Sequence, residues 1–132
     1  VLQYHPFLIK PNHTELSELC GVSLAADDFV GVRACAAQLQ EQGARNVLVS
    51  LGPNGALLLT EDGQVLHQEA AAGTVRNSVG AGDSMVAGFL TGLHLTGSYR
   101  EALQMGAAAG AATAFSDHLA TRREVEALLN TL

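Results

Sequence analysis

The sequence contains few basic residues, and this shortage excludes one class of function. Seven lysines and arginines stand against thirteen aspartates and glutamates in 132 residues, which gives a formal net charge of −6 at pH 7. Lys10 is the single lysine. A negatively charged chain repels the phosphate backbone of nucleic acids, so we expect no nucleic-acid partner. Small anionic ligands remain compatible with this charge, because local backbone and side-chain donors are enough to hold them.

Long apolar runs and cysteine motifs are also missing. No apolar stretch approaches the roughly 18 residues that a membrane-spanning helix needs, and the first ten residues, VLQYHPFLIK, lack the pattern of a signal peptide. Cys20 and Cys35 are the two cysteines and do not form a CxxC motif. We therefore expect a cytoplasmic protein without a membrane partner, in which both thiols are reduced.

Metal-binding patterns are missing as well. The five histidines show neither the HxxxH nor the HExxH spacing that binds zinc. What the chain does contain is apolar material, at 48% of its residues, with 15% charged residues. This composition is typical of a folded chain rather than a disordered one. The length is that of one domain, or of part of a larger one.

The apolar pattern alternates between strands and helices. Strands are expected at 6–9 and at 46–52, where the apolar run NVLVSLG is typical of a strand that is buried on both faces. A hairpin over 55–69 is expected to turn at Asp62-Gly63. Helices are expected at 13–21, from 27 or 28 to 42, and at 83–95, 99–115 and 122–131. Gly21 suits the end of the first of them. The small residues of the helices at 83–95 and 99–115, among them Gly88 and Gly106, indicate close packing against a neighbour. This order predicts an α/β fold with a mostly parallel sheet and one β-hairpin. In the second helix, the residues expected to face the core are Phe29, Val30, Ala34, Ala37 and Leu39.

Residues 77–84, NSVGAGDS, place two glycines and a carboxylate at the expected start of a helix. A Walker A loop would need Gly-Lys-Ser/Thr, and the single lysine, Lys10, lies far away in the sequence. A dinucleotide-binding loop would need a third glycine where Met85 stands, and a strand directly before the loop. Neither motif fits.

The N-terminus of the helix offers a third explanation. Its unpaired N–H groups attract anions, and Gly80, Ala81 and Gly82 leave that backbone open to a ligand. Asp83 would then place a base beside the anion. Such a pair suits the removal of a hydroxyl proton during phosphoryl transfer. The alternative is that Asp83 is an ordinary N-cap aspartate behind a flexible turn.

Three motifs together resemble those of a known family. The stretch NSVGAGDS resembles the C-terminal [DN][TS]xGAGD motif of the PfkB sugar kinases, which belong to the ribokinase superfamily. Asn12-His-Thr-Glu15 is similar to the NxxE motif of that family, and Ser50-Leu-Gly-Pro-Asn-Gly55 is similar to its SxGxxG motif. The resemblance implies a three-layer α/β/α ribokinase-like fold, of which residues 1–132 would form the C-terminal, nucleotide-binding portion.

The resemblance also implies roles for the glycine stretch. Asp83 is the expected catalytic base, and the amides of Gly80, Ala81 and Gly82 are the expected anion hole for the transferred phosphoryl group. ATP would be the phosphoryl donor, and Mg²⁺ would accompany it.

The other two motifs would hold the nucleotide. By the same resemblance, Asn12 and Glu15 would act indirectly, through Mg²⁺ and its waters, and Ser50, Gly52 and Gly55 would lie along ATP. Plainer roles stay open for these residues by themselves. Asn12 also suits a helix cap, Glu15 a solvated carboxylate, and Ser50 and Gly52 the end of a strand.

Two further stretches indicate the substrate. Lys10-Pro-Asn12 resembles the phosphosugar branch of the family, in which the lysine would pair with the ATP phosphates; a surface lysine is the alternative. Residues 107–128, AAAGAATAFSDHLATRREVEAL, resemble the C-terminal end of the 1-phosphofructokinases. We therefore expect transfer of a phosphoryl group to the 6-hydroxyl of fructose 1-phosphate, giving fructose 1,6-bisphosphate. Tagatose-6-phosphate kinase and 6-phosphofructokinase are the alternatives.

The resemblance leaves out the N-terminal half of the family, where the sugar-binding residues and the lid mainly lie. We therefore expect residues 1–132 alone to be inactive. We also expect them to self-associate, for example as a homodimer, through an exposed edge or face of the sheet. A function of another class stays open, namely a non-catalytic module that binds nucleotide. Asp83 favours the enzyme, because a binding module has no use for a base beside the anion.

Overall fold

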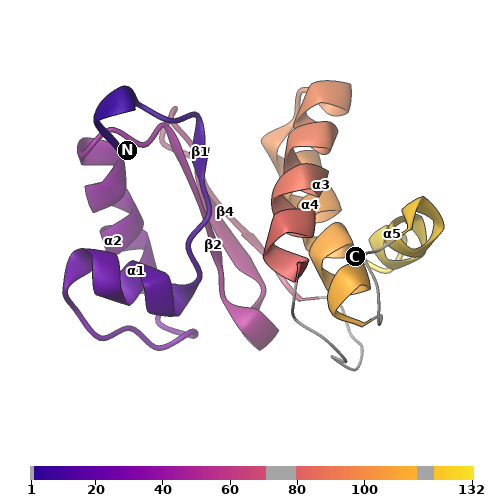
Figure 1. Cartoon of the computed structure of the whole chain (residues 1–132), viewed down its shortest axis with the longest axis horizontal. Coiled ribbons are helices and arrows are strands. Elements are labelled where there is room, and N and C mark those ends of the chain that lie inside the picture. The colour runs from indigo at the N-terminus through magenta and orange to yellow at the C-terminus, as the bar shows by residue number, and fades with distance from the viewer. Residues whose placement is uncertain (1, 71–79, 116–120) are drawn as a thin grey trace. The chain divides into compact units, whose positions relative to one another are not determined.

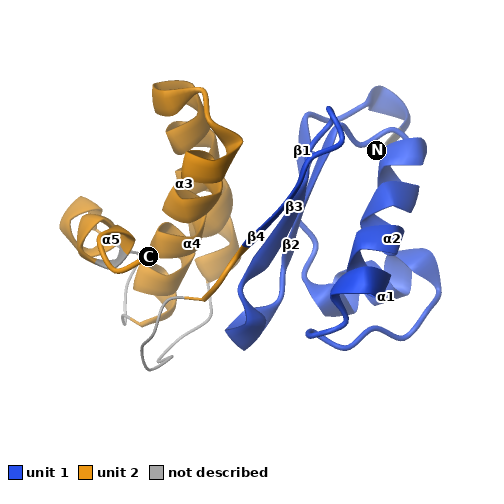
Figure 2. Cartoon of the chain, turned by 180° about the vertical axis from the view of Figure 1, so that it is seen from behind, with its two compact units in different colours: residues 1–67 blue, residues 68–132 orange. Residues whose placement is uncertain are grey.

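The computed structural model describes residues 2–70, 80–115 and 121–132. It divides into two compact units, Val1–His67 and Gln68–Leu132, which are considered separately (Figure 2). The strand or loop expected ahead of the glycine stretch lies almost entirely outside the described residues. Positions 77–79 of that stretch and positions 116–120 of the C-terminal resemblance lie outside them too.

Unit 1 is a small sheet with two helices on one face (Figure 1). In chain order its elements are η1 (Leu2–Tyr4), β1 (Leu8–Ile9), α1 (His13–Cys20), α2 (Phe29–Glu41), β2 (Asn46–Ser50), η2 (Gly52–Asn54), β3 (Ala56–Leu59) and β4 (Val65–Gln68). Each helix of unit 1 has a boundary where the sequence predicts one. Gly21 closes α1 with a left-handed φ of 69°, and Asp28 caps the start of α2.

The sheet of the described strands is mixed. The strands lie in the order β1-β2-β3-β4. β1 runs parallel to β2, with Leu8 opposite Asn46, and β2 runs antiparallel to β3, with Val47 opposite Leu59. The described registers thus contain one parallel and one antiparallel pair, where the sequence favoured a mostly parallel sheet.

The expected hairpin joins β3 and β4. At its turn the Thr60 N–H donates to the Gln64 carbonyl at 2.9 Å, and the Gln64 N–H donates to the Thr60 hydroxyl at 2.9 Å. Gly63 adopts φ 88°, in the left-handed region that a residue with a Cβ rarely enters. The Asp62-Gly63 turn is therefore confirmed. It places β4 beside the strand that follows η2.

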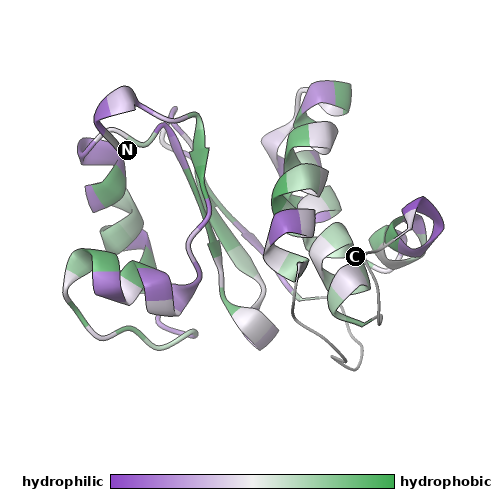
Figure 3. Cartoon of the chain, viewed as in Figure 1, coloured by the Kyte–Doolittle hydropathy of each residue, from purple (hydrophilic) through white to green (hydrophobic). Residues whose placement is uncertain are grey.

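β2 lies at the centre of the core of unit 1. Val47, Leu48 and Val49 are each 0% exposed. Because successive side chains of a strand point to opposite faces, this burial means that both faces of β2 are covered, as the run NVLVSLG predicts. The green colour of the strands in Figure 3 follows this apolar sequence. Each buried valine or leucine contributes about 1.5–3 kcal/mol relative to exposure.

The core-facing side of α2 differs from the expected one. Val30 is 83% exposed and Phe29 is 40% exposed, and Ala34 is exposed as well, so three of the five expected positions are wrong. The buried residues of α2 are Val32, Cys35, Ala36 and Leu39. They are spaced as i, i+3, i+4 and i+7, which is the pattern of one helix face. The helix carries apolar residues on two faces, and contact with β2 and β3 selects the second.

Unit 2 is helical, with α3 (Ala81–Thr96), α4 (Tyr99–Ala114) and α5 (Arg122–Leu129). Glycines let α3 and α4 approach closely, as their sequences predict. A Cβ added to Gly106 would lie 2.9 Å from the Met85 carbonyl oxygen, and one added to Gly88 would lie 2.8 Å from the Ala109 Cβ. No helix in the described part of the chain is long and apolar enough to cross a membrane.

Candidate functional site

Two of the predicted motifs meet in unit 1. Asn12 and Ser50 form an isolated parallel bridge, which continues the pairing of β1 with β2. The Ser50 N–H donates to the carbonyl of Pro11 at 3.1 Å. The start of the NxxE motif and the start of the SxGxxG motif therefore lie side by side, at the ends of two adjacent strands.

Asn12 and Glu15 form a capping box at the start of α1. The Glu15 N–H donates to the Asn12 side-chain oxygen at 2.7 Å, and the Asn12 N–H donates to the Glu15 carboxylate at 2.9 Å. This bonding satisfies two backbone donors at the helix start. The helix-cap role that the sequence left open for Asn12 is thus present. Both residues are exposed. The capping box engages the single side-chain oxygen of Asn12 and one carboxylate oxygen of Glu15, so the second Glu15 oxygen is left for a ligand.

These two side chains fit an indirect magnesium site. Amide and carboxylate oxygens are the donors that Mg²⁺ prefers, and Mg²⁺ keeps several of its waters when one or two carboxylates bind it. No group of three or more His, Cys, Asp or Glu residues that could hold a metal occurs among the described residues. One amide oxygen and one carboxylate suit an ion held through water and substrate phosphates better than one enclosed by protein ligands.

The SxGxxG motif forms a tight turn built around η2. The Asn54 N–H donates to the Leu51 carbonyl at 3.1 Å, the Gly55 N–H to the Gly52 carbonyl at 3.1 Å, and the Leu51 N–H to the Gly55 carbonyl at 2.8 Å. Gly52 and Gly55 have φ values of 57° and 88°. Both positions favour glycine for backbone reasons.

The Gly52 side of this turn leaves space for a ligand. A Cβ added there would meet no heavy atom within 4 Å, and Gly52 and Pro53 are exposed. Lys10 is half-buried and directly follows β1, two positions before Asn12. The predicted residues of the nucleotide side, Lys10, Asn12, Glu15, Ser50, Gly52 and Gly55, thus come from one edge of unit 1.

One residue near this turn is not expected from the sequence. His67 of β4 lies with Nε2 2.8 Å from the carbonyl oxygen of Asn54, inside the SxGxxG turn. Its ring also contacts that of Phe29, with the ring centroids 4.8 Å apart. No motif marks His67. The expected hairpin is the signal that could have located it, because a hairpin brings residues 64–69 back toward the turn.

The glycine stretch forms the N-terminus of α3 in unit 2. Gly80 is the N-cap residue, with a left-handed φ of 82°, and no side chain caps the helix. The first helical hydrogen bond runs from the Ser84 N–H to the Gly80 carbonyl at 2.9 Å. The amides ahead of Ser84, those of Ala81, Gly82 and Asp83, therefore have no intrahelical acceptor.

Asp83 lies in the first turn of α3 with an exposed side chain. It is not the N-cap residue, so the alternative of an ordinary N-cap aspartate is wrong. Among the described residues Asp83 makes no hydrogen bond or ion pair that would hold its carboxylate. Its neighbour Ser84 is bonded to Thr113 of α4 at 2.7 Å. The exposed carboxylate of Asp83 and the open amides beside it could act on an anion and a hydroxyl group together.

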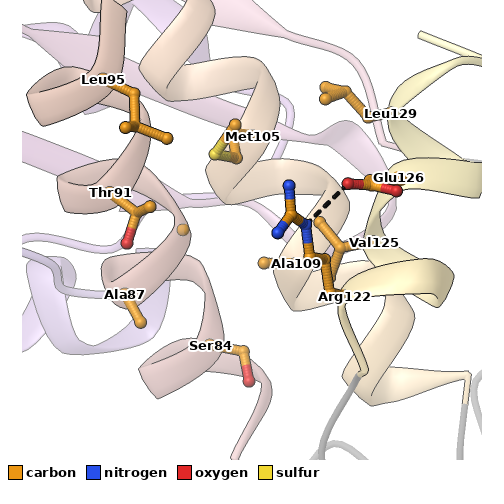
Figure 4. Close-up of a pocket in the computed structure, with 11 residues that line it drawn as sticks. Ser84, Ala87, Thr91, Leu95, Met105, Ala109, Arg122, Val125, Glu126 and Leu129 are labelled. Carbon is orange, nitrogen blue, oxygen red and sulfur yellow. Dashed lines mark hydrogen bonds and ion pairs between the residues drawn. The ribbon is translucent and has the colours of Figure 1, made fainter.

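A groove also runs between α3, α4 and α5 (Figure 4). Its volume is about 590 Å³, and most of its lining is apolar, including Leu95, Met105 and Val125. Arg122 and Glu126 form an ion pair at 2.9 Å on its α5 side. None of the expected site residues lines this groove, although Ser84 of the glycine stretch lies at one end of it.

Comparison with known proteins identifies the class. Residues 1–124 match the family described as pfkB family carbohydrate kinase. The chain is 44% identical over 125 residues to 1-phosphofructokinase of Bacillus subtilis, covering 94% of this chain and 40% of that protein. It is 42% identical over 118 residues to D-tagatose-1-phosphate kinase of Bacillus licheniformis, covering 89% of this chain and 38% of that protein.

Solved structures agree on the fold. The chain matches phosphofructokinase-2 from Escherichia coli, in complex with substrates and products, with a TM-score of 0.86 and 32% identity over 99% of this chain and 43% of that one. It matches a ribokinase from Arabidopsis thaliana, complexed with ribose and ATP, with a TM-score of 0.81 and 29% identity over 93% of this chain and 40% of that one.

The chain therefore belongs to the PfkB family of carbohydrate kinases, and its fold is ribokinase-like. Both expectations from the sequence are confirmed. The chain spans about two fifths of the length of the two curated relatives.

Proposed function

We propose that residues 1–132 are the nucleotide-binding part of an ATP-dependent kinase that phosphorylates fructose 1-phosphate to fructose 1,6-bisphosphate. The observation that carries this proposal is the 44% identity to a 1-phosphofructokinase over 94% of the chain. The three kinase motifs support it, because each contributes an exposed residue, namely Glu15, Gly52 and Asp83. Sugar-binding and lid residues would come from other parts of the family domain.

The nucleotide would be held by unit 1. Ser50, Gly52 and Gly55 would line the ATP phosphates or ribose, and the ammonium group of Lys10 would pair with a phosphate. Asn12 and Glu15 would hold the waters of Mg²⁺. When bound, this ion would supply positive charge beside the transferred phosphoryl group.

Unit 2 would supply the groups for the chemical step. The Asp83 carboxylate would accept the proton of the sugar 6-hydroxyl as that oxygen attacks the γ-phosphorus of ATP. The new oxygen–phosphorus bond would form as the bond from the γ-phosphorus to its bridging oxygen breaks, and ADP would leave. The amides of Gly80, Ala81 and Gly82 would stabilise the charge on the transferred group.

A panel of acceptors in a coupled ADP-release assay tests this function. The complete gene product that contains these residues would be assayed with MgATP and four substrates, namely fructose 1-phosphate, tagatose 1-phosphate, tagatose 6-phosphate and fructose 6-phosphate. We expect the highest kcat/KM with fructose 1-phosphate, and no ADP release above the sugar-free control when EDTA is present. A preference for another acceptor would replace the substrate, and ATP binding without turnover of any acceptor would favour the non-catalytic module.

Tagatose 1-phosphate is the sharpest competitor, because a relative at 42% identity is named for it. The two ketose 1-phosphates differ in the orientation of one hydroxyl group. A site that hydrogen-bonds that hydroxyl can discriminate strongly between the two sugars. A kcat/KM for one of them that exceeds the other by more than about 10² would therefore identify the preferred substrate.

We also propose that residues 1–132 alone lack activity and self-associate through a free edge or face of the sheet, and that the enzyme works in the cytoplasm, where ATP and sugar phosphates occur. Light scattering of residues 1–132 over a concentration series tests the self-association, and a monomer at all concentrations would reject it.

Cell fractionation with an antibody against the complete gene product tests the cytoplasmic location.

A further inference from the structure

We propose that His67 is a positioning residue that sets the conformation of the SxGxxG turn, and through it the affinity for ATP. The inference rests on the proposed function, because it assigns the turn to the nucleotide. It deepens that function by naming a residue outside the three motifs.

One carbonyl of the turn accepts a hydrogen bond from a donor outside the turn. Within the turn, the carbonyls of Leu51, Gly52 and Gly55 accept backbone N–H groups of the turn itself. The carbonyl of Asn54 accepts a hydrogen bond from the side chain of His67 instead, at 2.8 Å. His67 therefore links the turn to β4, the strand that returns beside it after the hairpin.

The direction of this bond is fixed by its acceptor. A backbone carbonyl can only accept, so Nε2 of His67 must carry the proton. Both the neutral tautomer with a proton on Nε2 and the doubly protonated ring satisfy this condition. A side chain of similar reach with an N–H group, such as glutamine, could replace the bond, and an aliphatic side chain could not.

The ring of His67 is also held in place. It packs against Phe29 at the start of α2, with the ring planes inclined by 55°. His67 is half-buried, and so is Asn54. Packing against an aromatic ring restricts the rotamers of the histidine, so its donor is directed at the turn before any ligand arrives.

The bonded peptide group is the one that precedes Gly55. Gly55 has φ 88° and ψ −134°, a conformation that other residues rarely adopt. Without the His67 bond, the peptide between Asn54 and Gly55 could rotate more freely and the turn would sample other shapes. A ligand that binds one shape would then bind more weakly, because part of its binding free energy would go to ordering the turn.

Three substitutions in the complete gene product separate the donor from the packing. His67→Leu removes the N–H donor and keeps an apolar side chain against Phe29. His67→Gln keeps an N–H donor of similar reach. Phe29→Leu tests the packing by itself, because it removes the ring contact and keeps the N–H donor, and we expect a smaller effect than that of His67→Leu.

The measurements are the KM for ATP, kcat, the affinity for ATP by calorimetry, and amide hydrogen exchange at Gly55. For His67→Leu we expect the KM and Kd for ATP to rise about 3- to 10-fold, the range that the net strength of one hydrogen bond predicts. We expect kcat and the KM for the sugar to stay within about twofold, since the turn does not contact the acceptor in the proposed function. The Gly55 amide should exchange faster, and His67→Gln should restore all values to within about twofold.

The outcomes distinguish this inference from the proposed function. If the wild-type enzyme is active and His67→Leu leaves the affinity for ATP and the Gly55 exchange unchanged, the role of His67 is rejected and the kinase stands. If the wild type binds ATP without phosphorylating any sugar, but His67→Leu weakens binding and His67→Gln restores it, the kinase is rejected and His67 keeps its role. If the wild type does not bind ATP, both are rejected. An effect of Phe29→Leu equal to that of His67→Leu would assign the effect to packing and overturn the inference.

Discussion

Asn12 and Ser50 lie opposite each other as a parallel bridge pair, although one belongs to the NxxE motif and the other to the SxGxxG motif. The pair keeps the parallel register of β1 and β2, because Asn12 lies three residues after Ile9 and Ser50 lies three residues after Val47. The carboxyl ends of parallel strands share one edge of a sheet, and in α/β proteins this edge is where ligands commonly bind. Two motifs far apart in the sequence thus present their side chains and amides together.

The capping box permits a test that separates structure from metal binding. Glu15→Gln keeps an oxygen that can accept the Asn12 N–H, so the cap of α1 should survive and the free energy of unfolding should change by less than about 0.5 kcal/mol. The substitution removes the negative charge, so the apparent affinity for Mg²⁺, measured from the Mg²⁺ dependence of the rate, should fall several-fold.

Glu15→Ala is the matched comparison, because it removes both the charge and the hydrogen bond that the Glu15 carboxylate accepts from the Asn12 N–H. It should lower stability by about 0.5–1 kcal/mol in addition to weakening the Mg²⁺ dependence. Equal Mg²⁺ dependence in the wild type and Glu15→Gln would show that Glu15 serves the helix alone.

The close contact of α3 and α4 predicts that replacing Gly106 by alanine lowers the stability, which is the opposite of the usual effect in a helix. In an exposed helix, glycine to alanine stabilises by roughly 0.5–1 kcal/mol. Gly106→Ala should instead lower the free energy of unfolding by about 1–3 kcal/mol, because the new Cβ would lie 2.9 Å from the Met85 carbonyl oxygen and the two helices would have to separate. Thr91→Ala, at an exposed position of α3, is the control and should stay within about 0.5 kcal/mol. Thermal unfolding measures both, and a Gly106→Ala protein as stable as the wild type would argue against the close packing.

Cys20 should be slow to react with thiol reagents. Burial, together with the neighbouring Cys35, raises the pKa of the Cys20 thiol from its ordinary value of 9.0 to about 11. Only the thiolate reacts, so at pH 8 alkylation of Cys20 should be about 100-fold slower than that of a free thiol. Mass spectrometry of iodoacetamide-treated protein measures this rate, and urea-unfolded protein is the control. Native labelling at the free-thiol rate would contradict the expectation.

The raised pKa of Cys20 also makes the stability of the folded chain depend on pH. The folded-state pKa lies above the unfolded one, so the protonated thiol favours the folded chain below about pH 9, and this contribution is lost as the pH rises toward 11. We therefore expect the unfolding temperature to fall as the pH rises from about 9 to about 11, and to fall less in Cys20→Ser.

Local sequence signals predicted most elements of the fold. The run NVLVSLG indicated a strand buried on both faces because every residue in its centre is apolar, and Val47 and Leu48 are both fully buried. Gly21 and Gly63 marked a helix end and a turn because their positions require a left-handed backbone. These features depend on residues close in sequence, which is why they can be predicted from it.

What could not be predicted depends on contacts between distant residues. The core-facing side of α2 was wrong because the helix has apolar side chains on two faces, and only packing on the sheet selects Val32 over Val30. His67 was missed because its partner, the Asn54 carbonyl, is a backbone group that no sequence pattern displays. The roles of Asn12 and Ser50 were expected from a family resemblance, and their adjacency appears only in the sheet.

The central claim is that Asp83 is the base for phosphoryl transfer beside the open amides of α3. The direct measurement compares Asp83→Asn with wild type in the complete gene product, using kcat with the preferred sugar phosphate and the affinity for MgATP by calorimetry. Asp27→Asn, an exposed aspartate ahead of α2, controls for the loss of one charge. We predict that Asp83→Asn lowers kcat by about 10²–10⁴-fold and leaves the affinity for MgATP within about threefold, with thermal stability close to wild type. A kcat within about tenfold of wild type in a folded, ATP-binding Asp83→Asn protein would contradict the assignment of Asp83 and the mechanism built on it.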